Sequence, residues 1–335
     1  MRILTVTNMY PTAANPQFGI FVKEQVQSIR ALGHEVDVLF VNGRDGRVRH
    51  KGYALGVPRL WRQMRRSEYD VVHAHYVLTG LVARCQWGTP LVLTHHGIEV
   101  QDGFQGSLCR WSRGFPDELI VVAPWMRDAL SAPRAHVIPC GVDLSLFHPM
   151  SQAEARQVLG LDASRRYVLF AGEWWRPEKR FHLVESAVQQ LQRRYPDIEL
   201  LKVDREAHWR VPLYMNAVDA LALVSTCEGS PMVVKEAVTC GLPVIATDAG
   251  DAWDVIDGIA GCYRVQPEIG EIATKLEEAL SPPRRIDGSN AARGFGMEAI
   301  ARDVVSVYQR AWCNSHRNQH APVLGGESAN SEKRA

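Results

Sequence analysis

The stretch that decides the fold is ALALVSTCEGSPMVVKE, residues 220–236. Its apolar opening, Ala220–Ser225, is typical of a buried strand in a parallel sheet. Ser230 can then cap a helix, and Pro231 can open it, because proline has no N–H for the first helical turn to leave unsatisfied. This order predicts a strand, a short loop and a helix that ends near Thr239.

Two glutamates frame that strand, loop and helix. Glu228 falls in the loop at the carboxyl end of the strand, and Glu236 falls about two turns into the helix. The free N–H groups from Ser230 to Val233 offer a site for an anion or for sugar oxygens. A carboxylate at Glu236 can hold two adjacent ribose hydroxyls, each bond being worth about 1.5–3 kcal/mol. The alternative is that both are ordinary surface glutamates beside a helix.

Strand and helix patterns alternate along the rest of the chain. Apolar runs in the first part predict buried strands at Ile3–Val6, Val36–Val41, Val71–Ala74, Leu91–Thr94, Leu119–Val122 and His136–Pro139. A second series predicts strands at Tyr167–Ala171, Ile198–Val203, Ala220–Ser225 and Pro243–Thr247. Helical spacing over Phe21–Leu32 and Phe181–Tyr195 places helices between strands. We therefore expect an α/β fold in which two Rossmann-like, doubly wound parallel sheets face a cleft.

The domain boundaries follow from composition. Gly141–Ser164 is polar with little strand character, and it predicts a linker. We expect an N-terminal, acceptor-side domain at 1–148 and a C-terminal, nucleotide-sugar donor domain at 149–296. A helix at 297–312 is expected to pack back on the first domain, and 313–335 is expected to be a disordered tail.

Bulk properties exclude several classes of protein. A chain of 335 residues with net charge +1 and 22% charged residues is typical of a soluble globular protein without a general affinity for nucleic acid. No apolar run approaches the roughly 20 residues that span a bilayer, and the N-terminus lacks signal-peptide features. We expect a cytoplasmic protein. Gly-x-Gly-x-x-Gly, a P-loop, Asp-x-Asp and Cys-x-x-Cys are all missing, so neither a cofactor nor a metal is expected.

Several stretches resemble the retaining glycosyltransferases of family four, which have the GT-B fold. EGSPMVVKE matches their E-x7-E motif, and similar stretches are GIFVKEQVQSIRALGHEVDVL, DVVHAHYVLTG, LVLTHHGIEV and VIPCGVDLSLF. The resemblance covers about residues 1–312 and is strongest to bacterial enzymes of surface-polysaccharide assembly, such as the teichuronic-acid type. It implies transfer of a hexose-type sugar, with retention, from a UDP- or GDP-linked donor to a glycan or lipid-linked acceptor.

The resemblance also assigns roles to residues at matching positions. It implies that Glu236 binds the ribose and that Glu228 lies near the donor sugar. His96 would contact the transferred sugar through its imidazole or its main chain, and Gly19 would let the backbone approach the diphosphate. Backbone amides for the sugar and diphosphate would come from Ser230, Pro231, Met232 and Val233.

The phosphate clamp departs from the family pattern. Relatives have Gly-Arg just after the strand and a lysine about five residues later, whereas this chain has GEWWRPEKR at 172–180. Lys179 takes the place of the lysine, and Glu173 stands where the arginine would be. Arg176 is therefore the expected second cation, because a leaving diphosphate develops negative charge that must be offset. The alternative is a solvated basic turn.

The segment 44–66 is basic and interleaved with apolar side chains. Its basic residues are Arg44, Arg47, Arg49, Lys51, Arg59, Arg62, Arg65 and Arg66, against Asp45 alone. Part of it is predicted to be an amphipathic helix that rests on anionic lipid, with each basic residue contributing about 1 kcal/mol. A lipid-linked acceptor would make such peripheral contact with the inner face of the membrane more favourable. A solvated face of the first domain is the alternative.

Two further questions stay open at the sequence level. His73 and His75 flank Ala74 and point the same way from a strand, and without a suitably spaced third ligand a hydrogen-bonding role is favoured over a metal site. A catalytically weak nucleotide-sugar-binding scaffold and a nucleotide-sugar epimerase on the same fold are the alternatives to a transferase.

Overall fold

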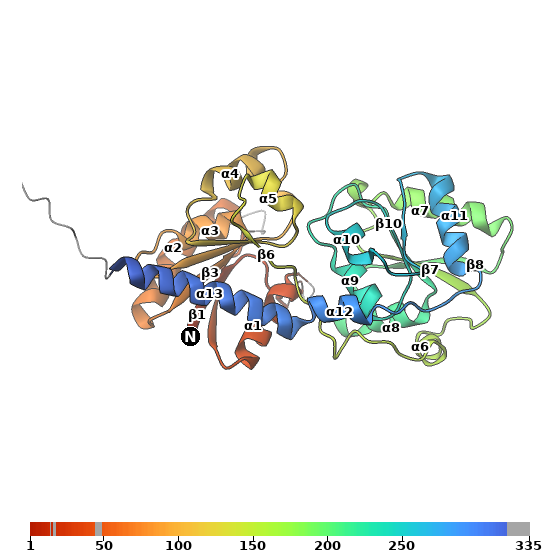
Figure 1. The fold of residues 1–335 in the computed structure, drawn as a ribbon, viewed down its shortest axis with the longest axis horizontal. Coiled ribbons are helices and arrows are strands. Elements are labelled where there is room, and N and C mark those ends of the chain that lie inside the picture. The colour runs from red at the N-terminus through yellow and green to blue at the C-terminus, as the bar shows by residue number, and fades with distance from the viewer. Residues whose placement is uncertain (14, 16–17, 44–48, 320–335) are drawn as a thin grey trace, which may run out of the picture.

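In the computed structural model, which describes residues 1–13, 15, 18–43 and 49–319, the chain forms two α/β domains joined end to end (Figure 1). Every strand pair among the described residues is parallel. Helices cover both faces of each sheet, so strands such as Val71–His75 are buried along their whole length. The predicted fold class, two doubly wound parallel sheets, is confirmed.

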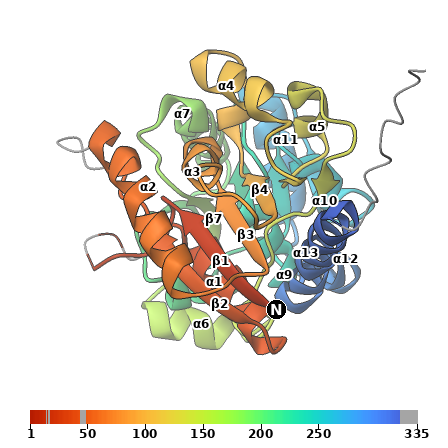
Figure 2. The same ribbon diagram turned by 90° about the vertical axis from the view of Figure 1, so that its left-hand side faces the viewer.

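The first domain is built on a sheet with strand order β2-β1-β3-β4-β5-β6. Its strands are β1 (Arg2–Thr7), β2 (Glu35–Phe40), β3 (Val71–His75), β4 (Leu91–His95), β5 (Glu118–Val121) and β6 (His136–Val137). Its helices are α1 (Ile20–Ala31), α2 (Arg49–Arg66), α3 (Val77–Ala83), α4 (Phe104–Ser112) and α5 (Trp125–Leu130). Successive residues of a strand serve opposite faces: Leu4 and Val72 join the core under α2, while Ile3 and Val71 join the core under the last helix. Figure 2 shows α2 and that last helix, α13, on opposite sides of the sheet.

The second domain is built on a sheet with strand order β11-β10-β9-β7-β8. Its strands are β7 (Arg166–Ala171), β8 (Ile198–Val203), β9 (Ala220–Leu223), β10 (Val244–Ala246) and β11 (Tyr263–Arg264). Its helices are α6 (Gln152–Leu159), α7 (Phe181–Gln192), α8 (Val211–Ala217), α9 (Met232–Thr239), α10 (Ala252–Ile256), α11 (Ile269–Leu280) and α12 (Ser289–Phe295). The predicted strands of both halves are present, with ends shifted by one or two residues.

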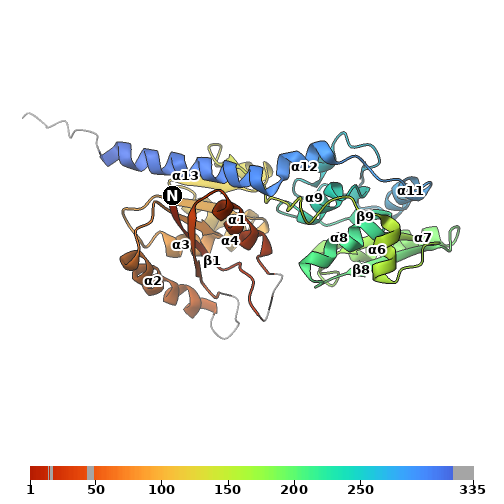
Figure 3. The same ribbon diagram turned by 90° about the horizontal axis from the view of Figure 1, so that it is seen from below.

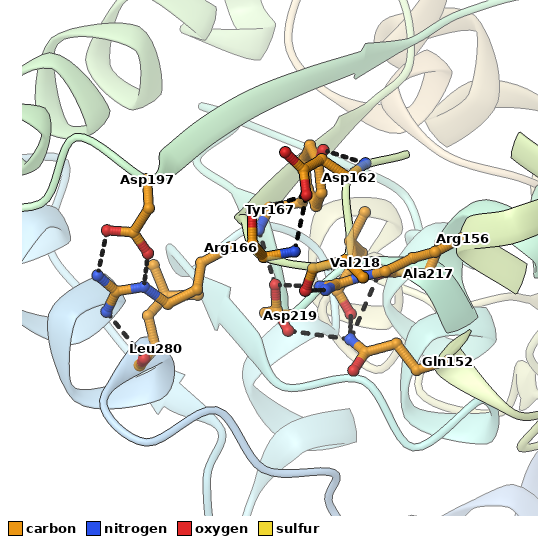
Figure 4. Close-up of polar contacts among 12 residues, drawn as sticks. Gln152, Arg156, Asp162, Arg166, Tyr167, Asp197, Ala217, Val218, Asp219 and Leu280 are labelled. Atoms are coloured by element: carbon orange, nitrogen blue, oxygen red, sulfur yellow. Dashed lines mark hydrogen bonds and ion pairs between the residues drawn. The ribbon is translucent and has the colours of Figure 1, made fainter. Parts of the chain in front are cut away.

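The predicted linker is an ordered part of the second domain. Within it α6 begins after Ser151, whose hydroxyl accepts the Glu154 N–H. From α6, Arg156 forms a buried ion pair with Asp219 at 2.9 Å, and Asp219 also accepts the Tyr167 N–H at 2.7 Å (Figure 4). The sequence does not predict α6, because the buried Arg156 makes this stretch polar in composition although it packs inside the domain.

The chain crosses between the domains twice, and the two crossings lie side by side. Val142 accepts a bond from the Met297 N–H at 3.0 Å and donates one to the Phe295 carbonyl at 2.8 Å. Gly141 packs so closely that a Cβ there would lie 2.8 Å from the Met297 Cα. These paired crossings form the covalent connection between the two domains.

The last helix, α13 (Met297–Gln319), runs back along the first domain against α1 (Figure 3). It continues past the predicted end at Trp312, so residues 313–319 are helical rather than part of a disordered tail. The Trp312 and His316 rings pack one turn apart with centroids at 4.0 Å, and Asn314 contacts Glu118, which extends the helix. Residues 320–335 lie outside the described residues. No described helix is long and apolar enough to cross a membrane.

Candidate functional site

The domains meet where the loop after β9 touches the loop after β4. A Cβ on Gly229 would lie 2.2 Å from the His96 carbonyl oxygen and 2.5 Å from the Gly97 Cα. Trp125 of the first domain donates its indole N–H to the Gly229 carbonyl oxygen at 3.1 Å. Gly250, with φ +70°, packs on the same loop, since a Cβ there would lie 2.7 Å from the Gly229 oxygen. The loop that carries Glu228 is therefore fixed by backbone contacts that larger residues would prevent.

Helix α9 begins at Met232, one residue later than predicted, and Ser230 does not cap it. The Ser230 hydroxyl instead donates to Asp251 at 2.7 Å and accepts a bond from the Lys235 ammonium. Pro231 occupies the N-cap position with extended backbone, ψ 106°. Glu236 consequently lies at the start of the second turn rather than two turns into the helix.

The predicted amide cradle is made by fewer residues than expected. Pro231 has no amide hydrogen, so it cannot donate and contributes only its shape. The N–H groups of Ser230, Met232 and Val233 have no hydrogen-bond partner among the described residues. These three N–H groups remain available for an anion or sugar oxygens at the start of α9.

Lys235 is a site residue that the sequence analysis did not select. Its side chain is 1% exposed, and its ammonium lies 3.2 Å from Asp251. The ammonium therefore sits beneath the loop that carries Glu228 and joins α9 to the loop after β10. A lysine within the otherwise apolar buried face of Val234, Ala237 and Val238 was the available signal.

Two predicted residues from different strand ends form a close ion pair. The Lys179 ammonium lies 2.6 Å from the Glu228 carboxylate, and their side chains are 20% and 17% exposed. The 173–180 loop is also held to the β9 end, because Thr226 donates its N–H to the Glu178 carbonyl at 2.7 Å. A positive and a negative group thus lie together beside the three free N–H groups.

Arg176, the expected second cation, is engaged within its own loop. Its guanidinium contacts Glu173 at 2.9 Å and also pairs with Glu178. The hydrogen bond that Arg176 donates to Glu173, joined by the one that it donates to Glu178, raises the pKa of Arg176 above its usual value. Its charge is already balanced by two carboxylates, so a diphosphate would have to displace them to use it. Lys179 is the cation that lies directly beside Glu228.

Glu236 points from α9 without a hydrogen bond to any described residue. Burial raises its pKa to about 7, a shift that His208 opposes and Glu24 reinforces. His208, after β8, lies 2.8 Å from Glu24 on α1 and so links the two domains. Burial lowers the pKa of His208, but Glu24 and then Glu236 raise it more, so it ends above its usual value. Neither member of this link was selected from the sequence.

His96 is held by its ring, which leaves its main chain facing the Glu228 loop. Its Nε2 lies 2.9 Å from His75 Nδ1, and its Nδ1 lies 3.7 Å from the Cys140 sulfur. Its backbone N–H donates to the buried Glu99 at 2.6 Å. Burial, followed by the charge of His75, lowers the pKa of His96 to about 3. A neutral ring with both nitrogens engaged favours the main-chain alternative for contact with a sugar.

His73 and His75 serve hydrogen bonding, as predicted. His73 contacts the Tyr308 hydroxyl at 2.6 Å and the Thr94 hydroxyl at 2.7 Å, which ties α13 to the sheet. His75 orients His96. Among the described residues no three His, Cys, Asp or Glu side chains gather closely enough to hold a metal ion.

Gly19 lies at the N-cap of α1 with φ +73°. A Cβ there would lie 2.2 Å from the Met9 carbonyl carbon and 2.5 Å from the Tyr10 nitrogen. Glycine is therefore required by the packing of its own loop. Residues 14, 16 and 17 of that loop lie outside the described residues.

Comparisons with known proteins agree with this architecture. The model of Glycosyltransferase Family 4 matches residues 19–146, and that of Glycosyl transferases group 1 matches residues 203–281. A D-inositol 3-phosphate glycosyltransferase from Frankia alni is 27% identical over 312 residues, covering 72% of this chain and 74% of that protein. One from Mycobacterium bovis is 28% identical, covering 77% and 65%.

Two solved structures show the same fold at low identity. Sucrose-phosphate synthase from Thermosynechococcus elongatus superposes with TM-score 0.76 at 18% identity, covering 94% of this chain and 100% of the other. Anabaena Alr3699/HepE in complex with UDP-glucose gives 0.69 at 19% identity, covering 92% and 100%. With a family 4 domain followed by a group 1 domain, this chain belongs to the glycosyltransferases of the GT-B type.

Proposed function

We propose that this glycosyltransferase moves a hexose-type sugar from a UDP- or GDP-linked donor to a glycan or lipid-linked acceptor in surface-polysaccharide synthesis. The observation that carries the proposal is the arrangement at the start of α9. Glu228, three free N–H groups and the unbonded Glu236 carboxylate lie on the β9–α9 loop and on α9, against the main chain of His96, and Lys179 reaches Glu228 from the loop after β7. This set offers a cation and N–H donors for a diphosphate and an acceptor for ribose hydroxyls.

The relatives support a nucleotide-sugar donor. HepE was solved with UDP and glucose and with UDP-glucose. The curated relatives are named for transfer to D-inositol 3-phosphate. The proposed surface-polysaccharide role rests instead on the resemblance of stretches such as EGSPMVVKE.

We propose that transfer retains the anomeric configuration by a front-face reaction without a metal. A double displacement needs a free carboxylate as nucleophile. Glu99, close to His96, is buried and accepts the His96 N–H, and Glu228 is paired with Lys179. In the front-face reaction the bond between the anomeric carbon and the diphosphate oxygen breaks, and the acceptor oxygen bonds to the same face. The hydroxyl proton passes to the leaving phosphate, whose charge Lys179 and the N–H groups offset.

Product analysis with labelled UDP- and GDP-hexoses tests this function. We expect donor-dependent transfer to a surface-polysaccharide or lipid-linked acceptor, or slow donor hydrolysis in its absence. Lys179→Ala should lower turnover by about 10²-fold, because a charge that stabilises the leaving group is lost. Donor binding without turnover would instead support the scaffold, and a changed but untransferred sugar would support the epimerase. Absence of both binding and turnover across the donor panel would contradict the proposal.

A further inference from the structure

The end of the first domain away from the cleft carries an unusual surface. The segments that lead into β3, β4, β5 and β6 all lie at the amino edge of the sheet, because the strands are parallel. The carboxyl end of α13 reaches the same edge, where Asn314 contacts Glu118. Figures 1 and 3 show α13 running to the end of the molecule furthest from the second domain. We call this end the basal face. It comprises the aromatic residues Trp61, Trp87, Trp111 and Phe115 and the arginines Arg65, Arg84, Arg113, Arg134 and Arg310.

Exposed aromatic side chains form a continuous line across the basal face. Trp61, Trp87 and Trp111 are 41%, 80% and 65% exposed. The Trp61 and Trp87 rings lie 6.5 Å apart, and Trp111 packs edge-on against Phe115 at 4.6 Å. Trp87 and Phe115 line one surface hollow, which joins the two pairs. Clustered exposed tryptophans indicate a contact surface rather than chance exposure.

Arginines surround this aromatic line. Three neighbouring surface hollows lie along this face, two of them lined by its aromatic side chains. The arginines that line the three hollows are Arg65, Arg84, Arg113, Arg134 and Arg310. None of the five forms an ion pair with a described acidic residue, whereas Arg156 and Arg166 in the second domain do. The acids that line the third hollow are engaged: Asp117 accepts the Leu91 N–H, and Glu118 pairs with His136. Five arginines against the two acids Asp117 and Glu118 leave these hollows with a net positive charge, in a chain whose overall net charge is +1.

We propose that the basal face docks on an anionic lipid bilayer. Tryptophan is favoured at the level of lipid headgroups, where its ring meets both apolar and polar surroundings. Arginine binds headgroup phosphates, and clustered arginines are attracted to the negative surface. A soluble polyanion would satisfy the arginines alone and would leave Trp87 and Trp111 in water. A bilayer satisfies both groups at once, so it is the occupant that the surface fits.

The docking surface is broader than the basic segment 44–66 picked out in the sequence. That segment contributes Trp61 and Arg65 from α2, while its residues 44–48, with Arg44 and Arg47, lie outside the described residues. The remaining tryptophans and arginines come from α4, from loops that precede strands and from α13. Arg84 and Arg310 are 226 positions apart in the sequence (310 − 84), so no local pattern joins these residues.

Docking through the basal face has a consequence for the acceptor, and it rests on the proposed function. Pro90 lines the basal hollow, and His96 lies at the cleft at the other end of β4. Six residues of strand span about 20 Å. The cleft would therefore stand about 20 Å above the headgroups, where it meets the growing end of a lipid-linked glycan rather than a sugar at the membrane surface.

Vesicle flotation of the full chain tests the docking. The vesicles are phosphatidylcholine alone and a 70:30 mixture with phosphatidylglycerol. We expect binding to the anionic vesicles that weakens as salt is raised from about 0.05 to 0.5 M, because exposed charges become screened. Arg84→Gln with Arg113→Gln and Arg134→Gln should lower partitioning about fivefold per residue, or roughly 100-fold together. Trp87→Ala with Trp111→Ala should lower it by at least about tenfold.

Matched controls come from the second domain. Trp209 is 64% exposed, close to the 65% of Trp111, and Arg193 and Arg284 are exposed there. Trp209→Ala, and Arg193→Gln with Arg284→Gln, should leave flotation unchanged. Unchanged melting temperatures of all variants would show that a lost interaction does not reflect unfolding.

Each outcome decides between the proposals. Absence of flotation by the wild-type chain, or equal loss in basal and control variants, overturns the docking. So does binding to soluble polyglutamate but not to anionic vesicles. A chain that turns over labelled donor without binding vesicles overturns the docking and keeps the proposed function. A chain that binds vesicles but binds no donor overturns the proposed function and keeps the docking.

Discussion

Among single residues, Glu236 has the chemistry that depends most on its surroundings. Its half-buried carboxyl has no hydrogen bond to a described residue, and burial raises its pKa to about 7. Ribose hydroxyls donate hydrogen bonds that favour the ionised form. A donor should therefore bind the ionised protein and lower this pKa. In the free protein the raised pKa favours folding below the unfolded value of 4.5, and this contribution is lost as the pH rises to about 7.

We predict that UDP-glucose or GDP-mannose, whichever binds, gains about tenfold in affinity from pH 6 to 8. The ionised fraction of a group with pKa about 7 rises by that factor. Glu236→Gln should bind weakly at both values and show no such gain in calorimetry. The free variant should also melt above the wild type at pH 8. A gain that persists in Glu236→Gln would assign the titration to another group.

Lys235 shows what a buried charge requires of its neighbours. Its ammonium is matched by Asp251 and Ser230, so removing it leaves a buried carboxylate unpaired. We predict that Lys235→Met lowers the free energy of unfolding by about 3–5 kcal/mol, and that adding Asp251→Leu restores much of it. Urea denaturation measures both variants. Equal losses in the single and double variants would mean that the pair is not coupled.

At the scale of elements, local signals predicted strand β9, its loop and α9 to within one or two residues. A β-rich run, glycine and proline act within a few residues of one another, so their pattern is visible in the sequence. The Lys235–Asp251 contact and the Glu24–His208 link join residues far apart in the chain, and α6 is held by the buried pair of Arg156 with Asp219. These features depend on tertiary contacts, which a single sequence does not display.

The contact between the two cleft loops gives an element-scale prediction. Gly229→Ala places a methyl group 2.2 Å from the His96 oxygen, so the loops must separate. Since displacement of about 1 Å can cost 10²-fold in rate, transfer should fall by at least that factor while nucleotide binding by the second domain changes little. Gly97→Ala is the matched control, because its Cβ would lie 3.2 Å from the Gly229 Cα and requires a smaller shift. Equal activity of the two variants would contradict the assigned role of the contact.

At the scale of the whole molecule, the domains are joined by paired crossings and linked across the cleft by Glu24 and His208. Burial lowers the pKa of His208, yet Glu24 and Glu236 raise it above 6.5 overall. A raised histidine pKa means that the charged pairing contributes fully below 6.5 and is lost as the pH rises through the higher folded value. A rise in pH therefore weakens the link between the domains while it ionises Glu236.

We predict that the free protein opens between pH 6 and 8.5. Small-angle X-ray scattering should show a larger radius of gyration at the higher pH, because the charged link between domains is lost. Glu24→Gln should have the larger radius at both values, whereas the exposed Glu35→Gln should behave as the wild type. A wild-type radius that does not change, or a change that persists in Glu24→Gln, would contradict this role.

We infer that the second domain holds a nucleotide-sugar through Glu236 and the Lys179–Glu228 pair. Thermal unfolding against UDP, GDP and their sugars tests it most directly. A ligand at 100 times its dissociation constant adds about 2.7 kcal/mol, which should raise the melting temperature by roughly 5–10 °C. We expect this shift with one nucleotide family, reduced in Glu236→Gln and Lys179→Ala and unchanged in Trp209→Ala. No shift with any nucleotide, or an equal shift in all variants, would contradict the donor site.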